Sequence, residues 1–374
     1  MITRLRSATK SSDVAIFFAQ MESPKAENHS SVSNCIEESV GTSENQIAQL
    51  LRLPGRSGLP VSPNATSSNL NSIEAQTLTM YSNQVGGHRV LVKPKDSSVV
   101  LKPYDEAEFN FYDQCMPVMC SCLMPFTARC YGEVDLRSPA SPDHPAKGGK
   151  YVMLEDLAHG ISKPCILDLK MGLKQRSIHN YSFKKLQSKA YKSISTTSHQ
   201  LGFRLGGAQL YQNGQDVAFY NKYFGRLQDA EGTYTILKCL FGSVPNPNLR
   251  KNIIEIYVSK LKELRAVLRG LKGLRFWSGS LLLVFDSVGV SGSISQETVM
   301  LKMIDFANYT RLPDSIESAG DFDREYDYGI ECLVKFLEGI INKETIESVL
   351  SRIEANQPPD PEVQDKELMA TADA

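Results

Sequence analysis

The sequence contains no apolar run that approaches the ~20 residues needed to cross a bilayer, so no insertion into a membrane is expected. Neither sign of charge is in excess, because 41 basic and 42 acidic residues leave a formal net charge of −1. This balance predicts no general attraction to nucleic acid or to a membrane surface. The eight cysteines include one close pair, Cys120 and Cys122, and no second pair that would complete a zinc site. Reduced thiols in a protein of the cytoplasm, the nucleus or both are expected.

Two widespread phosphate-binding signatures are also missing. The sequence has no Gly-x-x-x-x-Gly-Lys-Ser/Thr, which excludes a P-loop. It has neither His-Arg-Asp nor Asp-Phe-Gly, which argues against an ordinary protein kinase. Phosphoryl transfer needs a cradle for the phosphates of ATP, a carboxylate for magnesium and positive charge around the reacting oxygens. Candidate residues of each kind are nevertheless present.

Composition divides the 374 residues into four segments. Residues 1–78 are rich in Ser, Asn, Gln and Glu, so they are predicted to form a disordered leader, a candidate for binding other proteins. Residues 79–160 and 161–356 are predicted to form an N-terminal and a C-terminal lobe. Residues 357–374 are acidic and contain several prolines, which predicts a loose tail.

The N-terminal lobe is predicted to have a β–β–α–β order. Short β-type runs occur at Val90–Val92 and Val99–Leu101, and a helical period covers Asp105–Cys115. Tyr151–Leu154 is a further strand candidate.

The C-terminal lobe contains two long helical patterns and two apolar strands. Ile253–Leu271 places its apolar residues on one helical face, and Tyr328–Ile341 returns to the same period. Ser280–Asp286 and Val299–Phe306 are predicted to pair as a hairpin with a polar loop between them. The predicted fold class is therefore α+β, with two lobes and a cleft between them.

Four candidate residues of a nucleotide site lie in the N-terminal lobe. Lys102 ends a Val-Val-Leu-Lys strand, where its ammonium would meet phosphates, and Glu108 on the next helix is placed to hold it by an ion pair. Glu155 and Asp156 follow a strand at the lobe junction, where backbone groups would read adenine. The competing interpretations are a surface lysine with a solvated glutamate, and an ordinary acidic turn.

Two aspartates end strands of the C-terminal lobe. Asp305 follows an apolar strand and precedes Phe306, so its carboxylate is predicted to be half-buried. A buried carboxylate is unfavourable unless it is paired or bound to a metal, so it either ligates magnesium or belongs to a structural ion pair. Asp286 is followed by turn-forming residues and is interpreted as a turn cap.

The stretch from Lys163 to Arg204 is strongly basic. Its only acidic residue is Asp168. A charge run on a solvated surface usually alternates in sign, so this one indicates a polyanionic ligand. Nucleic acid is not the expected partner, because too few aromatic residues are interleaved to act as stacking platforms.

The run from Pro164 to Gly172 has the form Pro-x-x-x-Asp-x-Lys-x-Gly, which resembles the signature of the inositol polyphosphate kinases. Further matches follow in the same order as in that family. They are Gln84–His88, Leu154–Leu157, Ser278–Leu282 and Ile304–Ala307. The resemblance covers roughly residues 83–340. It implies a two-lobed, kinase-like fold with antiparallel sheets and an ATP cleft between the lobes, the N-terminal lobe binding ATP and the C-terminal lobe carrying catalysis and the inositol phosphate.

Several segments look more like the inositol hexakisphosphate kinases than the multikinases. These segments include Leu167–Gly172, Leu201–Arg204 and Gly207–Tyr211. One departure is Asn308, where the animal relatives usually carry His after Ile-Asp-Phe-Ala. The resemblance therefore implies phosphorylation of inositol hexakisphosphate to diphosphoinositol pentakisphosphate. The alternatives are a multikinase acting on hydroxyls of inositol tris- or tetrakisphosphate, and an inactive inositol-phosphate sensor or scaffold.

The resemblance also implies an ATP site and a magnesium site. Lys102, held by Glu108, would contact the phosphates of ATP. Glu155 and the backbone of Leu157 would bind adenine, and Asp168 would bind ribose. Magnesium would be ligated by two further residues, Asp305 and Ser280.

Lys170 would bridge the transferred phosphate and the acceptor oxygen, neutralising charge as it moves. An acceptor that is itself a phosphate is already deprotonated, so no general base would be needed. The acceptor would be bound mostly by cations. The residues implied in this contact, besides Lys170, are Lys184, Lys185, Lys189, Lys192, Arg204, Gln209 and Lys222.

Overall fold

The protein was studied as a computed structural model. The structure describes residues 78–87, 89–136, 149–176, 188, 191–212, 216–288, 298–315, 317–356, 358–360, 363 and 365. The predicted leader up to residue 77 and most of the predicted tail lie outside the described residues.

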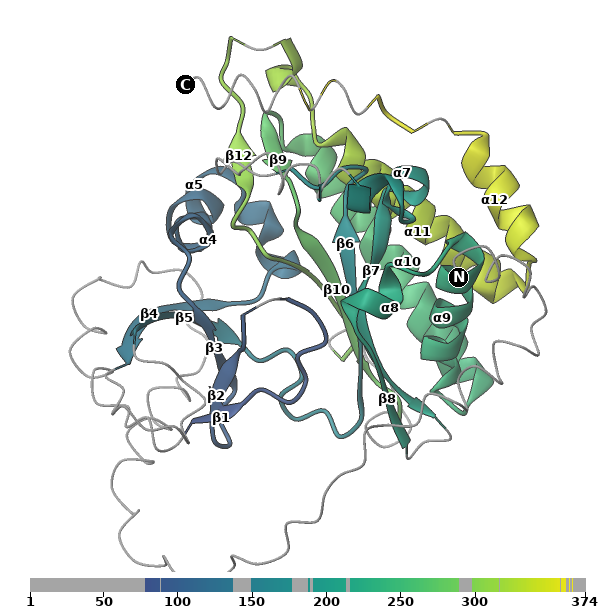
Figure 1. The fold of residues 1–374 in the computed structure, drawn as a ribbon, viewed down its shortest axis with the longest axis horizontal. Coiled ribbons are helices and arrows are strands. Elements are labelled where there is room, and N and C mark those ends of the chain that lie inside the picture. Colours follow the sequence, from purple (N-terminus) through teal and green to yellow (C-terminus); the bar gives the residue numbers. More distant parts are fainter. Residues whose placement is uncertain are drawn as a thin grey trace, which may run out of the picture. The chain divides into compact units, whose positions relative to one another are not determined.

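The first sheet is antiparallel and has the strand order β1-β2-β3-β5-β4 (Figure 1). Its strands are β1 (Leu78–Met80), β2 (Val92–Pro94), β3 (Val99–Pro103), β4 (Cys130–Leu136) and β5 (Gly149–Glu155). Alternate residues of β3 face a small apolar core of their own, in which Val99 and Leu101 contact Tyr151 and Met153. The strands predicted over Val99–Leu101 and Tyr151–Leu154 are thus confirmed.

A chain of short helices connects β3 to β4. It comprises α4 (Glu106–Asn110), the π-helix η3 (Phe111–Cys115), α5 (Met116–Met119) and the 3₁₀-helix η4 (Ser121–Phe126). Asp105 caps α4 by accepting a hydrogen bond from the amide of Glu108 at 3.3 Å. The helical period predicted over Asp105–Cys115 is confirmed, with its second half wound as a π-helix.

The second sheet is also antiparallel and has the order β11-β10-β6-β7-β8. Its strands are β6 (Pro164–Met171), β7 (Phe203–Gln212), β8 (Asp216–Tyr220), β10 (Ser280–Asp286) and β11 (Met300–Ile304). The hairpin predicted between the two apolar strands is confirmed by the pairing of β10 with β11.

Helices cover one face of the second sheet (Figure 1). They include α9 (Ala230–Gly242), α10 (Pro247–Gly270), α11 (Arg324–Asn342) and α12 (Ile346–Glu354). Shorter elements complete the lobe: α7 (Ser198–Leu201), α8 (Lys222–Gly225), η5 (Glu317–Gly320), β9 (Leu274–Phe276) and β12 (Tyr309–Arg311). The helix α10 confirms the amphipathic pattern, since Ile254, Leu261 and Leu268 are buried on one side. Within the described chain, no helix is long and apolar enough to span a membrane.

The strand β6 lies at the centre of the second sheet and separates two environments by its period of two. Leu167 and Leu169 face the helices and contact the region of α9. Ile166, Asp168 and Lys170 face the opposite side and line a pocket. The alternation in Pro-Cys-Ile-Leu-Asp-Leu-Lys-Met therefore carries both the core and the chemistry.

The two sheets are joined close to this pocket. Thr127 forms a parallel bridge with Met303 of β11, and Lys302 donates hydrogen bonds to the carbonyls of Pro125 and Thr127. Phe111 of η3 stacks on Phe306 with ring centroids 3.9 Å apart. The fold is α+β with antiparallel sheets, as the sequence predicted.

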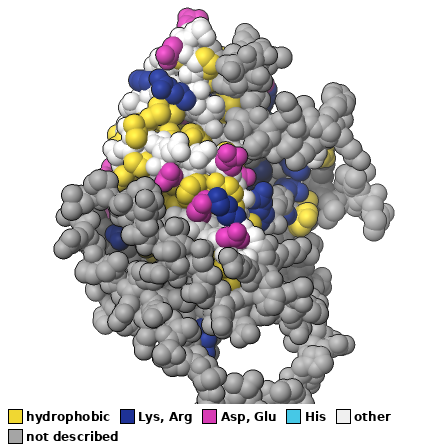
Figure 2. All heavy atoms as spheres, turned by 90° about the vertical axis from the view of Figure 1, so that its left-hand side faces the viewer, with side chains coloured by type: hydrophobic (Ala, Val, Ile, Leu, Met, Phe, Trp, Pro, Cys, Tyr) yellow, Lys and Arg dark blue, Asp and Glu magenta, His cyan; other side chains and the backbone are white. Residues whose placement is uncertain are grey.

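On the face shown in Figure 2, basic, acidic and hydrophobic side chains of the described residues are intermixed near the middle of the view. This mixture agrees with the near-zero net charge of the sequence.

Candidate functional site

A pocket of about 530 Å³ lies between the two sheets, within the size range of small-molecule sites. Both lobes contribute to its lining. The predicted site residues in the lining are Lys102, Glu108, Glu155, Leu157, Asp168, Lys170, Lys192, Arg204, Lys222 and Asp305. The structure thus brings together residues that are separated by up to two hundred positions in the sequence.

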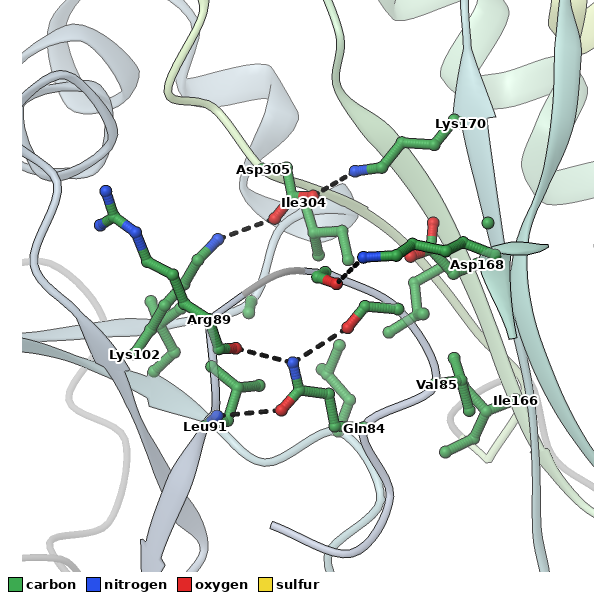
Figure 3. Close-up of a pocket in the computed structure, with 18 of the residues that line it drawn as sticks. Gln84, Val85, Arg89, Leu91, Lys102, Ile166, Asp168, Lys170, Ile304 and Asp305 are labelled. Carbon is green, nitrogen blue, oxygen red and sulfur yellow. Dashed lines mark hydrogen bonds and ion pairs between the residues drawn. The ribbon is translucent and has the colours of Figure 1, made fainter. Parts of the chain in front are cut away.

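Asp305 is the centre of the charges in the pocket. Lys102 donates to its Oδ1 atom at 2.7 Å, and Lys170 donates to its Oδ2 atom (Figure 3). Figure 3 shows the two lysines approaching from different sides, one from the first sheet and one from β6. Burial disfavours a charged carboxylate, but the two lysines outweigh it and hold the pKa of Asp305 well below its usual range. Asp305 is therefore ionised at any physiological pH.

Lys102 is itself held by Glu108, with 2.8 Å between the ammonium and the carboxylate. Burial lowers the pKa of Lys102, whereas Asp305 and Glu108 raise it more, so that its pKa lies above the ordinary value. The predicted ion pair between Lys102 and Glu108 is confirmed, and the interpretation of Lys102 as a lone surface lysine is wrong. Glu108 also accepts a hydrogen bond from the amide of Phe306 at 3.3 Å, which ties the helix to the segment after β11.

The backbone of Asp305 adopts the left-handed region, with φ 65°. A residue other than glycine there is uncommon and unfavourable unless its surroundings fix it. Here the next residue, Phe306, is buried, stacked on Phe111 and hydrogen-bonded to Glu108. The strand β11 ends at Ile304, and this turn points the carboxylate into the pocket. The predicted half-burial of Asp305 is confirmed, since 27% of its side chain is exposed.

Asp168 is almost fully buried in β6. Burial raises the pKa of its carboxyl group, while Lys170 opposes the rise. A Cβ added at Gly86 would lie 1.9 Å from its Oδ2 atom, and one at Gly206 would lie 2.9 Å from its Oδ1 atom. Two glycines therefore give a loop of the first lobe and the strand β7 their close approach to this carboxylate.

The wall next to β5 has the properties of an adenine site. Apolar side chains from both sheets and from the loop after β1 line it, namely Val85, Val100, Leu154, Ile166, Leu282 and Val284. The amide of Leu157 makes no hydrogen bond to any part of the chain that the structure describes. A flat apolar slot with one available N–H donor fits a purine ring. The Glu155 carboxylate accepts a hydrogen bond from the Arg129 amide at 3.1 Å, so it is engaged by the protein.

The opposite end of the pocket is cationic. Burial and, to a smaller extent, the neighbouring charge of Arg226 lower the pKa of Arg204 to about 10. The pKa of Lys192 is also lowered, first by burial and then by the positive charges of Arg226, Arg204 and Lys222. Four cations therefore lie close enough to repel one another. Of the acceptor contacts implied by the resemblance, Lys184, Lys185 and Lys189 lie outside the described residues.

Two predicted site residues are not part of the pocket lining. Ser280 is fully buried in β10, and its hydroxyl group favours the charged form of Asp168. Gln209 is buried in β7 and donates to the carbonyl of Pro164 at 2.9 Å and to Asn83 at 3.3 Å. Its contacts hold β7 to β6 and to the loop that follows β1.

Part of the basic stretch serves the fold. The buried Arg176 pairs with Glu325 at 2.8 Å, and also with Asp365 at 2.8 Å. Lys174 pairs with the same Asp365 at 2.5 Å. The sequence reasoning treated the whole stretch as facing a ligand, and the structure corrects this, because carboxylates distant in sequence neutralise these two cations.

Some lining residues were missed by the sequence reasoning. Arg226 is one of them, because it lies 22 positions after the end of the basic stretch at Arg204 and carries no charge pattern of its own. Gln84 closes a loop by donating to the carbonyls of Gly86 and Arg89 and accepting from the amide of Leu91 (Figure 3). Only the match to Gln84–His88 pointed to this loop, and His88 lies outside the described residues.

Comparison with known proteins gives a consistent result. A family model described as inositol polyphosphate kinase matches residues 151–338. The chain is 31% identical over 284 residues to inositol hexakisphosphate kinase 1 of Rattus norvegicus, covering 65% of this chain and 64% of that protein. It is 30% identical over 249 residues to inositol hexakisphosphate kinase 2 of Oryctolagus cuniculus, covering 58% and 57%. The chain therefore spans less than two thirds of the length of these curated relatives.

A solved structure shares the fold. The inositol phosphate multikinase Ipk2 of S. cerevisiae, in complex with ADP and Mn2+, superposes with a TM-score of 0.52 at 20% identity. The match covers 66% of this chain and 100% of that one.

Proposed function

Because this chain belongs to the inositol polyphosphate kinase family, we propose that it transfers the γ-phosphate of ATP to a phosphate group of inositol hexakisphosphate. The observation that carries the proposal is the position of Lys170. Its ammonium contacts Asp305 on the proposed nucleotide side. Its backbone is the ladder partner of Arg204, which lies at the cationic end of the pocket. A phosphate in transit between the two ends of the pocket would pass this ammonium.

We propose that the nucleotide lies along the wall formed by β3, β5 and β6. The apolar slot would hold adenine, with the Leu157 amide as donor, and Asp168 would accept from the ribose hydroxyls. Lys102, whose ammonium is fixed by Glu108, would contact the phosphates.

Asp305 is the residue proposed to hold a divalent metal. The described residues contain no cluster of three or more His, Cys, Asp or Glu side chains that could bind a metal ion. Mg2+ is commonly held by one or two carboxylates together with substrate phosphates and water, so one aspartate in the pocket fits a metal that arrives with the nucleotide. The bound metal would neutralise charge on the phosphates.

The chemistry needs no general base when the acceptor is a phosphate. An oxygen of the ionised acceptor phosphate would form the new P–O bond as the bond between the β-phosphate oxygen and the γ-phosphorus of ATP breaks, leaving ADP. The relatives at about 30% identity named as hexakisphosphate kinases support this acceptor. Lys170 would stabilise the charge that shifts between the two oxygens.

The proposal is tested by incubating the chain with magnesium-ATP and either inositol hexakisphosphate or inositol trisphosphate, and separating the products by anion-exchange chromatography with mass detection. The expected product gains one phosphate on the hexakisphosphate. Lys170→Ala should abolish it, whereas Lys251→Ala, on the exposed side of α10, should not. Phosphorylation of the trisphosphate alone would establish the multikinase activity instead, and turnover of neither would sink the proposal.

A further inference from the structure

The guanidinium groups of Arg204 and Arg226 face the pocket with no carboxylate of the described chain within ion-pair distance. Arg204 is 8% exposed, and its side chain donates to the neutral hydroxyl of Ser198 at 3.0 Å. The one acid that acts on it electrostatically is Asp168, which also faces Lys170. A buried cation that lacks a counter-charge is unfavourable, so this end of the pocket is built for an anion.

The position of Arg226 is fixed by the packing of α8. Asn221 caps this helix by accepting hydrogen bonds from the amides of Tyr223 and Phe224 at 2.9 and 3.2 Å. A Cβ at Gly225 would lie 2.3 Å from the carbonyl oxygen of Leu205 in β7. The backbone of α8 therefore touches the strand next to Arg204, and Arg226 follows immediately. Two like charges are held together by the fold in spite of their repulsion.

This pair lies beside the point of phosphoryl transfer. Arg204 and Lys170 are direct partners across β7 and β6, and both side chains line the pocket. Partners in an antiparallel ladder have Cβ atoms about 4.5–5.5 Å apart. An anion bound by the two arginines would thus neighbour an anion bound by Lys170.

We propose that Arg226, acting with Arg204, binds the acceptor phosphate adjacent to the one that is extended, and so selects acceptors that carry phosphates on neighbouring ring positions. This inference rests on the proposed function, because it takes the acceptor to be an inositol phosphate. Each guanidinium offers a planar pair of donors that matches two phosphate oxygens, which a lysine cannot reproduce. The site prefers a fully phosphorylated ring to a sparsely phosphorylated one.

The test compares Arg226→Gln and Arg226→Lys with Arg324→Gln, an exposed arginine on α11 that removes the same charge away from the pocket. Loss of a charge-assisted, bidentate contact should raise the KM for inositol hexakisphosphate about 10- to 100-fold in Arg226→Gln. The KM for ATP should change less than about twofold, since the contact lies away from the nucleotide. The KM of Arg226→Lys for inositol hexakisphosphate should lie between those of Arg226→Gln and the unaltered chain, and the KM of Arg324→Gln should equal that of the unaltered chain.

Binding of inositol hexakisphosphate without nucleotide, measured by calorimetry on the same full-length variants, separates the two proposals. If the unaltered chain binds the hexakisphosphate through Arg226 but transfers no phosphate, the role of Arg226 in binding an inositol phosphate is supported and the proposed function falls. If it turns over while Arg226→Gln retains the original affinity and KM, the inference is overturned and the proposed function stands. If Arg226→Gln loses affinity equally for inositol tris- and hexakisphosphate, the selectivity for neighbouring phosphates is overturned. If the unaltered chain binds neither ligand, both the inference and the proposed function are overturned.

Discussion

At the scale of single residues, the chemistry converges on Asp305. Two lysines from different lobes share its carboxylate, and its left-handed backbone is fixed by the buried Phe306 beside it. An ordinary structural ion pair would need neither two cations nor an unfavourable backbone. The arrangement supports the proposal that this carboxylate exchanges protein ammonium groups for a metal and phosphates.

Asp305→Asn is predicted to lower kcat by at least about 10²- to 10³-fold, because the amide cannot replace the charge that orders the metal and the two lysines. Asp286→Asn is the matched control, since Asp286 also ends a strand but accepts only from the Val288 amide in a turn. Steady-state rates and far-ultraviolet circular dichroism of both variants provide the measurement. An Asp305→Asn protein that turns over normally would contradict the assignment.

Asp168→Asn is predicted to weaken nucleotide binding without lowering the thermal stability of the protein. The pKa of Asp168 is raised in the folded state, mainly by burial, so the charged form disfavours folding above its unfolded pKa near 3.8. Removing the ionisable group should leave the melting temperature at pH 7 unchanged or higher, while ADP binds more weakly. Asp314→Asn, at an exposed position, is the control. A clear loss of thermal stability with unchanged ADP affinity would contradict this account.

At the scale of elements, the loop between β1 and β2 contacts both lobes. Its shape depends on three hydrogen bonds of Gln84 to the backbone. It contacts the second sheet so closely that a Cβ at Gly207 would lie 1.9 Å from the carbonyl of Val85. The loop is therefore a wall of the pocket that belongs to the first lobe and rests on the second.

Gly86→Ala is predicted to displace this loop from Asp168, because the new Cβ would lie 1.9 Å from the carboxylate. The expected effects are a loss of about 1–3 kcal/mol in the free energy of unfolding and a rise of about 10-fold in the KM for ATP. Gly242→Ala, in α9 with open space around its Cβ, should be neutral or stabilising. Equal behaviour of the two variants in melting and kinetic assays would refute the role of this contact.

Elements with a strong period were predictable from the sequence, and so was the hairpin of β10 with β11, but the order of the other strands in the sheet was not. The helix α10 and the strands β10 and β11 follow from their apolar patterns, whereas the strand β6 was not predicted. That β6 lies between β10 and β7 depends on contacts far apart in the chain. The positions of Ser280 and Gln209 follow from that pairing. It places the Ser280 hydroxyl near Asp168 and lets Gln209 donate to the carbonyl of Pro164.

Among the site residues, Lys102 and Asp305 could be predicted because each lies at the end of an apolar strand, and Glu108 because it lies on the helix that follows Lys102. Arg226 could not, since only the packing of Gly225 on Leu205 brings it to Arg204. Arg176 was misjudged because its partner Glu325 lies 149 positions away in the chain.

At the scale of the whole molecule, the described pocket has opposite electrostatic ends. Carboxylates of Glu108, Asp168 and Asp305 surround the proposed nucleotide side, and Lys192, Arg204, Lys222 and Arg226 form the other. Lys170 stands between them. This polarity supports the proposal that nucleotide and acceptor bind at opposite ends of the pocket, although the net charge of the chain is only −1.

Because several cations act together on the acceptor, its KM is predicted to rise about 10-fold between about 50 mM and about 300 mM salt. The measurement is a series of initial rates at fixed, saturating ATP. The acceptor KM of Arg226→Gln should depend less steeply on salt than that of the unaltered chain. A series in a neutral osmolyte should leave the acceptor KM unchanged. An acceptor KM that does not respond to salt would argue against the cationic end as the acceptor site.

We propose that Lys170 stabilises the transfer of a phosphate from ATP to a phosphate of inositol hexakisphosphate. Phosphorus nuclear magnetic resonance of a reaction containing the chain, magnesium-ATP and inositol hexakisphosphate tests it most directly, with Lys170→Ala in parallel. The account predicts new diphosphate resonances on the ring with stoichiometric ADP, absent from the variant. A new phosphate monoester on a less phosphorylated ring, or ATP consumption with an unaltered hexakisphosphate spectrum, would contradict it.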